Sequence, residues 1–181
     1  MKSLIIIALL ALVLQAEKIG ILTKSDRTFT IKMNGADFNI TRDMTACGKN
    51  KGWLQELVPV AGVKPVTELD ILDALKNNSA VLVDMRMGDD FYEATIPNAI
   101  NIPFNLITSE LEQLGCTYDK KWECSQAVEV IVFCNGPVCP QSPFGMKKMV
   151  ENSYPANKIS YYRGGMMDWD ALGLTTVKGE F

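Results

Sequence analysis

Two short apolar segments constrain the fold of this chain more than any other feature. Residues 80–84 and 128–133 are rich in valine, leucine and isoleucine and hold few polar residues. Strands that are covered on both faces have this composition, which is typical of parallel sheets. From residue 66 onward such strands alternate with segments of helical spacing. This order predicts an α/β fold of three layers, with a mainly parallel central sheet between two layers of helices.

Capping signals predict where two of the helices begin. Thr67 followed by Asp70 is a weaker form of the Ser/Thr-x-x-Glu box. Ser142 followed by Pro143 predicts a second start, with the serine as N-cap and the proline in the first turn. The apolar face of the first helix is predicted from three leucines at helical spacing: Leu69, Leu72 and Leu75. We also expect strands at 99–102 and 159–162 and a helix at 106–114.

The N-terminal part of the chain has a different pattern. Residues 1–16 contain Lys2 and an apolar run over 4–14, which is too short to span a membrane and predicts a secretory signal peptide cleaved near Ala16. Residues 17–65 are expected to form an extension and linker, with a β-hairpin around Asn34-Gly35. We therefore expect a periplasmic or secreted protein with no membrane span after cleavage, and a main domain at 66–181.

Composition excludes several functional classes. The 181 residues carry a formal net charge of −3, which argues against a nucleic-acid partner. The chain has no histidine, which removes Ser-His-Asp and Cys-His catalysis and every histidine-ligated metal site. Its five cysteines are an odd number, so at least one is unpaired or chemically active: Cys47, Cys116, Cys124, Cys134 and Cys139.

Cys134 is the candidate nucleophile. It follows the strand at 128–133 and precedes a short loop and the helix that begins near Ser142, which is where α/β folds bind ligands. Loop N–H groups and the helix dipole are expected to lower the pKa of this thiol. Gly136 and Pro137 would shape the turn. A structural disulfide with Cys139 stays open; zinc is disfavoured, and Pro140 stands where a phosphatase loop needs arginine.

Five motifs in order resemble the rhodanese (thiosulfate sulfurtransferase) family. They are a strand ending in Asp84-Met85-Arg86, the pair Asp90-Phe91, the stretch Ile96–Pro103, the loop Cys134–Cys139, and Tyr162-Arg163-Gly164-Gly165 with Trp169 and Gly173. The resemblance implies a rhodanese-like domain and a sulfurtransferase. Its donor would be a small sulfur-containing anion such as thiosulfate or polysulfide, and its acceptor a thiol, a protein or cyanide. No cofactor or metal is implied.

The resemblance also implies roles for the residues of the loop. Cys134 would carry a persulfide, held by loop residues Asn135, Gly136, Pro137, Val138 and Cys139. Two alternatives remain. The second loop cysteine, a candidate resolving thiol, favours a thiol–disulfide oxidoreductase that uses the Cys134/Cys139 pair. The lack of basic residues at positions 135 and 139 favours a non-catalytic sulfur carrier or binding module.

Two further pairs of residues are predicted to support the structure. We expect Asp84 and Arg86 to form an ion pair that fixes one end of the sheet. Cys116 and Cys124 flank a polar stretch, 117–123, that resembles an insertion. A surface disulfide between these cysteines is favoured over two free thiols.

Overall fold

The computed structural model describes residues 28–41 and 53–180. The predicted signal peptide and Cys47 lie outside these ranges. The chain divides into two compact units, Met1–Arg42 and Asp43–Phe181, and each has its own architecture. None of the helices in the described ranges is long and apolar enough to cross a membrane.

The first unit contains the predicted β-hairpin. Strands β1 (Thr28–Met33) and β2 (Ala36–Thr41) pair antiparallel, with Met33 opposite Ala36. Asn34 and Gly35 connect them with φ values of 53° and 82°. Positive φ at both central residues is the geometry of a two-residue hairpin turn, which Asn-Gly favours. The hairpin prediction is confirmed.

The second unit is built on a five-stranded sheet in the order β3-β9-β8-β4-β5, in which every pair of neighbours is parallel. The strands are β3 (Lys64–Pro65), β4 (Val81–Asp84), β5 (Ile100–Asn101), β8 (Val130–Phe133) and β9 (Ile159–Tyr162). Strand β8 lies at the centre and is buried along its whole length. The predicted α/β fold with a parallel central sheet is confirmed, and the strand at 99–102 is shorter than predicted.

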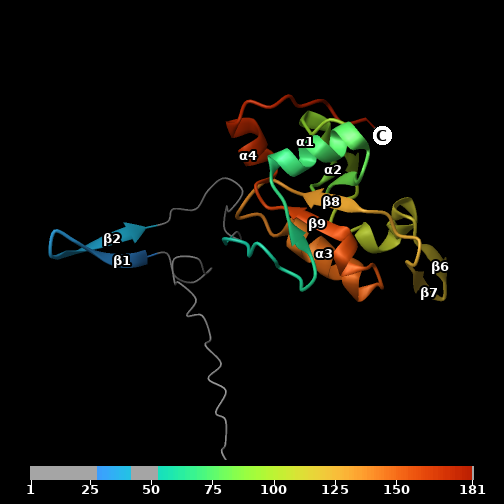
Figure 1. Ribbon diagram of the computed structural model, residues 1–181, viewed down its shortest axis with the longest axis horizontal. Helices are drawn as coiled ribbons and strands as arrows, with labels where there is room; N and C mark the ends of the chain where they lie inside the picture. The colour runs from blue at the N-terminus through green and yellow to red at the C-terminus, as the bar shows by residue number, and fades with distance from the viewer. Residues whose placement is uncertain (1–27, 42–52, 181) are drawn as a thin grey trace, which may run out of the picture. The chain divides into compact units, whose positions relative to one another are not determined.

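Helices cover both faces of this sheet. Helices α1 (Glu68–Asn77) and α4 (Gly165–Ala171) lie on one side of β8 and β9, and α3 (Gln141–Glu151) lies on the other (Figure 1). The short helix α2 (Gly88–Glu93) follows β4. The face that α3 covers is extended by the 3₁₀ turns η2 (Ile107–Ser109) and η3 (Leu111–Leu114), and η4 (Ala156–Lys158) leads into β9.

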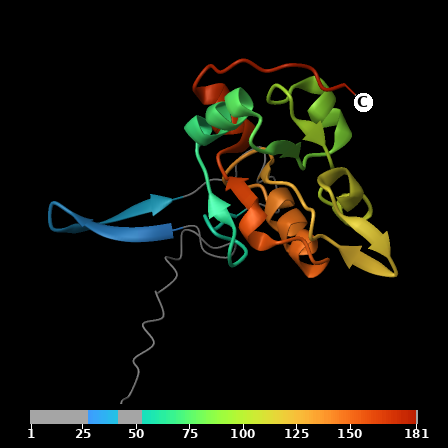
Figure 2. The same ribbon diagram turned by 45° about the vertical axis from the view of Figure 1, so that its right-hand side comes forward.

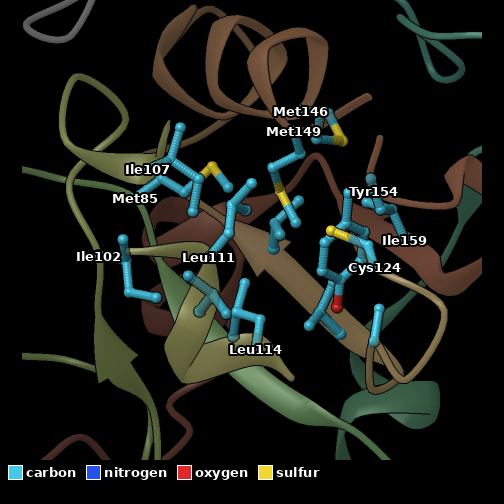
Figure 3. Close-up of a cluster of buried hydrophobic side chains, with 14 of the residues drawn as sticks. Met85, Ile102, Ile107, Leu111, Leu114, Cys124, Met146, Met149, Tyr154 and Ile159 are labelled. Carbon is cyan, nitrogen blue, oxygen red and sulfur yellow. The ribbon is translucent and has the colours of Figure 1, made fainter. Parts of the chain in front are cut away.

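Alternation along the strands divides the core between the two faces. In β8, Val132 packs on the α3 side, whereas Ile131 and Phe133 pack on the side of α1 and α4. The α3 side holds the larger cluster, in which side chains from the strands, α3 and the 3₁₀ turns meet (Figure 3). Its labelled members are Met85, Ile102, Ile107, Leu111, Leu114, Cys124, Met146, Met149, Tyr154 and Ile159.

Three local predictions are wrong. The segment 106–114 forms two 3₁₀ turns rather than one helix. In α1, Leu69 is 76% exposed, while Ile71 and Ala74 face the core, because the leucine pattern and the buried face are offset around the helix. Helix α3 begins at Gln141 with Pro140 as N-cap, so Ser142 lies inside the first turn instead of capping it.

The predicted capping box at the start of α1 is present. The backbone N–H and the hydroxyl of Thr67 donate to the Asp70 carboxylate at 2.9 and 3.0 Å. The backbone hydrogen bond from Thr67 is the main reason that the pKa of Asp70 lies below its usual value.

Residues 117–123 form a small hairpin closed by a disulfide. Strands β6 (Thr117–Asp119) and β7 (Lys121–Glu123) pair antiparallel, and the hairpin projects from the unit (Figure 2, yellow). The sulfurs of Cys116 and Cys124 are 2.10 Å apart. Both cysteines are buried in the core cluster on the α3 side, so the bond is not on the surface as expected. It ties an exposed hairpin to the core.

Candidate functional site

Cys134 lies directly after the central strand β8, where the chain leaves the sheet. Its main chain is held by the start of α4, because the Met166 and Met167 N–H groups donate to the carbonyls of Cys134 and Asn135 at 3.0 and 2.9 Å. This close approach explains Gly165, which has a φ of 58°. A Cβ at this position would lie 2.2 Å from the Cys134 carbonyl oxygen. Gly165, the second glycine of the closing motif, is thus required by the cysteine loop.

The loop is also held by a segment that the sequence did not identify. The Gln55 N–H donates to the Pro137 carbonyl at 2.8 Å, and the Gln55 carbonyl accepts from Arg163 Nη1 at 3.2 Å. Gln55 is only 5% exposed. The neighbouring Trp53 packs edge-on against Phe144 of α3, with ring centroids 6.4 Å apart. Residues 53–55, which we call the loop strap, therefore connect the cysteine loop, α3 and Arg163.

Cys134 and Cys139 face each other in a buried environment, and neither forms a disulfide in this structure. Cys134 is 1% exposed and its thiol donates to the Cys139 carbonyl at 3.6 Å. Cys139 is 2% exposed and its thiol donates to Gln141 Oε1 at 3.3 Å. The thiols of the two cysteines also interact with each other. The structure therefore brings together the two loop cysteines that the sequence singled out.

The expected lowering of the Cys134 pKa is wrong for this structure. Burial raises the pKa of Cys134 well above its ordinary value, and the Cys139 thiol raises it further. The hydroxyl and backbone N–H of Ser142 act in the opposite direction, but they do not outweigh burial. The loop amides also contribute less than expected. Pro137 has no N–H, and the Cys139 N–H donates to the Gly136 carbonyl at 2.9 Å.

Two buried hydroxyls close to the cysteines were not predicted as functional groups. Ser142 is completely buried and Tyr161 is 1% exposed. Neither hydroxyl has a hydrogen-bond partner among residues 28–41 and 53–180. The alternation of β9 could have indicated that Tyr161 faces α3, but the sequence could not show that its hydroxyl lacks a partner.

Asp84 and Arg86 fix the same edge of the sheet. The Asp84 carboxylate is fully buried and accepts from Arg86 Nε, Arg86 Nη2 and the Arg86 N–H at 2.6 to 3.1 Å. The Thr95 hydroxyl donates to it at 2.9 Å, and the Asn101 amide donates to the Asp84 carbonyl at 2.9 Å. Asp84 is opposite Phe133 in the sheet register. This network connects β4 and β5 beside the residue that precedes Cys134.

Two surface hollows lie away from the cysteine loop. These hollows, of about 670 and 600 Å³, adjoin each other between α3, η2 and the β6–β7 hairpin and share Thr108, Glu151 and Asn152. Cys134 lines neither. Among the described residues no group of three or more Asp, Glu, Cys or His side chains is arranged to hold a metal ion.

A model of the family described as "Rhodanese-like domain" matches residues 68–172, which is more than half of the chain. The match includes the sheet from β4 to β9, the cysteine loop and the start of α4. The chain belongs to the rhodanese-like family of sulfurtransferase domains.

The chain is also similar to individual proteins. A solved structure, the BH2092 protein from Bacillus halodurans, is 21% identical, covers 65% of this chain and 77% of its own, and superposes with a TM-score of 0.53. The thiosulfate sulfurtransferase from Pseudomonas aeruginosa is 20% identical over 65% of this chain and 21% of its own, with a TM-score of 0.48. The HTH-type transcriptional regulator Rv0324 of Mycobacterium tuberculosis is 24% identical over 63% of this chain, which spans only 45% of that relative.

Proposed function

We propose that the protein is a sulfurtransferase that carries sulfane sulfur on Cys134 as a persulfide. The observation that supports this most directly is the position of Cys134 at the carboxyl end of the central strand, with the hydroxyl and N–H of Ser142 favouring its thiolate. Carboxyl ends of parallel strands are where α/β folds bind and transform ligands. Family membership adds a sulfurtransferase context.

The proposed reaction has two transfers. The Cys134 thiolate attacks the outer sulfur of thiosulfate, the S–S bond of thiosulfate breaks, and sulfite leaves with the bonding electron pair. The enzyme retains the sulfur as a persulfide. An acceptor thiolate then attacks the outer sulfur of the persulfide, takes that sulfur and regenerates the Cys134 thiolate. A polysulfide donor would react in the same way and leave as the chain shortened by one sulfur.

We further propose that this reaction takes place outside the cytoplasm, in the periplasm or in secreted form. The proposal depends on residues 1–16, which lie outside the described ranges. The buried disulfide between Cys116 and Cys124 fits an oxidising compartment, where such bonds persist. N-terminal sequencing of the protein after expression in a Gram-negative host would test it. A mature N-terminus near Glu17 is expected, and an intact Met1 in a cytoplasmic fraction would contradict the proposal.

The contact between the two loop thiols favours a second candidate function, a thiol–disulfide oxidoreductase. If Cys139 attacks the inner sulfur of the Cys134 persulfide, the outer sulfur leaves as hydrogen sulfide and an intramolecular disulfide forms. A dithiol reductant must then restore both thiols. Replacing Cys139 by alanine should lengthen the lifetime of the persulfide and make turnover less dependent on added dithiol.

Intact-mass measurement after incubation with thiosulfate separates these functions. A gain of one sulfur atom that is lost in Cys134→Ser supports sulfur transfer, whereas a loss of two hydrogens alone supports a disulfide switch. Cys134→Ser should also abolish thiocyanate formation from cyanide, because a serine hydroxyl is not ionised at this site. Cys139→Ala is the matched control, because it removes the neighbouring thiol and retains the nucleophile. Retained thiocyanate formation in folded Cys134→Ser protein would refute the assignment, and no mass change in the wild type would favour a non-catalytic binding module.

A further inference from the structure

Two polar groups beside Cys134 have no evident structural role. The Ser142 and Tyr161 hydroxyls are both at least 99% buried, and neither forms a hydrogen bond within the described part of the chain. Buried hydroxyls are normally paired, because losing water without gaining a partner destabilises the folded state. An unpaired hydroxyl at a functional site therefore indicates a partner that is present in another chemical state.

The two hydroxyls reach Cys134 from different elements. Tyr161 is opposite Val132 in the parallel register of β8 and β9. Val132 and Tyr161 therefore point to the same face of the sheet, and Cys134 follows Val132 by two residues, directly after the end of β8. This is the face covered by α3, whose first turn contributes Ser142. One donor thus approaches the thiol from the neighbouring strand and the other from the helix after the loop.

Electrostatic interactions agree with this placement. Negative charge on Cys134 or Cys139 raises the pKa of Tyr161, after burial as the larger cause, while Arg163 lowers it. The Ser142 hydroxyl lowers the pKa of Cys134. Both hydroxyls therefore remain protonated near neutral pH, and they can donate to an anionic sulfur.

Building on the proposed sulfurtransferase function, we propose that the Ser142 and Tyr161 hydroxyls form a two-donor site for the outer sulfur of the Cys134 persulfide. In the free thiol, Cys134 donates its own hydrogen to the Cys139 carbonyl, and there is no anion for the two hydroxyls to bind. When the persulfide forms, the outer sulfur carries the negative charge and accepts from both O–H groups. The arrangement stabilises the loaded enzyme over the free enzyme and thereby favours sulfur capture.

The proposal is tested by the equilibrium between free and loaded enzyme. Purified protein is mixed with thiosulfate and sulfite at a series of ratios, and the fraction with one added sulfur is measured by intact mass. Tyr161→Phe and Ser142→Ala should each lower the loading constant about tenfold or more, the size expected for a lost hydrogen bond to a charged group. Neither change should lower the urea midpoint of the free thiol form, because the hydroxyls have no partner to lose there.

Tyr154→Phe is the matched control. Tyr154 is also a buried tyrosine of the same core cluster (Figure 3). Its hydroxyl, however, donates to the Val128 carbonyl at 2.6 Å. Its loss should lower the urea midpoint and leave the loading constant unchanged. If the wild type loads sulfur and the Tyr161 and Ser142 variants load equally well, the two-donor site is refuted while the sulfurtransferase stands. If the wild type takes up no sulfur, both are refuted.

Discussion

The disulfide between Cys116 and Cys124 should make a stability contribution that can be calculated and measured. The bond closes a loop with a sequence separation of 8 residues. In the chain-entropy model such a loop restricts the unfolded chain enough to contribute about 2.5 kcal/mol at 25 °C. With a melting entropy typical of the roughly 130 residues in 53–180, this corresponds to a melting temperature lower by about 9 °C. Both cysteines should be replaced by alanine together, because one replacement alone leaves a reactive thiol.

Urea and thermal unfolding of the double variant and the wild type, monitored by circular dichroism, give the difference in free energy of unfolding and in melting temperature. Sulfur loading of Cys134 should be unchanged, since the disulfide joins an exposed hairpin to the core and takes no part in the cysteine loop. The control is a dithiol reductant, which should lower the stability of the wild type to that of the variant and leave the variant unaffected. Equal stability of the variant and the oxidised wild type would refute the argument, as would loss of loading in folded variant protein.

Three further predictions concern the edge of the sheet that carries Cys134. Asp84→Ala should lower the free energy of unfolding, measured in urea titrations, by about 3–5 kcal/mol, because it leaves the buried Arg86 guanidinium without its partner. A loss below about 1 kcal/mol would contradict this, because the pair would then contribute no more than a typical surface ion pair. Gly165→Ala should destabilise the protein more than Gly173→Ala and should also lower sulfur loading. Both glycines have positive φ, at 58° and 68°, but only at Gly165 would a Cβ meet the main chain of Cys134, whereas Gly173 has open space. Equal losses of stability in the two variants would contradict the close approach of Gly165 to the main chain of Cys134. The rate of Cys134 alkylation by iodoacetamide in Cys139→Ala should still rise about tenfold per pH unit at pH 8.5, because burial raises the pKa of the Cys134 thiol. The same shift makes folding stability fall as the pH rises above about 8.5, since the native state keeps a proton that the unfolded chain releases. An alkylation rate that levels off at or below about pH 8.5 would contradict the raised pKa of the Cys134 thiol.

The fold could be predicted because its determinants are local and repetitive. The apolar runs in β4 and β8 must be buried on both faces, and a parallel sheet between two layers of helices buries them in this way. The Asn34-Gly35 turn is similarly determined by two residues that tolerate positive φ. The capping box at Thr67 needs only groups that are three residues apart. In each case the residues that determine the local structure lie within a few positions of one another in the sequence.

The predictions that failed depend on contacts between distant segments. Serine is a common N-cap residue, but helix α3 starts two residues earlier than Ser142 as N-cap would require, and Ser142 is buried beside Cys134. The raised pKa of Cys134 depends on how completely the surrounding core and loop exclude water, which cannot be inferred from the loop residues alone. Gln55 contacts Pro137 across 82 positions, and no pattern near Gln55 marks it as part of the loop strap.

A raised pKa reduces the reactivity of Cys134 less than the thiolate fraction suggests. Each additional pKa unit lowers the fraction of thiolate about tenfold at neutral pH but raises the nucleophilicity of that thiolate about threefold, so the net loss is about three- to fourfold per unit. Oxidation of cysteine follows thiolate character and exposure, and both are low at a thiol that is 1% exposed. In an oxidising compartment, a neutral and buried Cys134 would therefore lose less of its rate toward an admitted sulfur donor than its thiolate fraction suggests, and it would resist irreversible oxidation. Burial, which contradicts the simplest expectation for a nucleophile, is consistent with a sulfur carrier that must survive between turnovers.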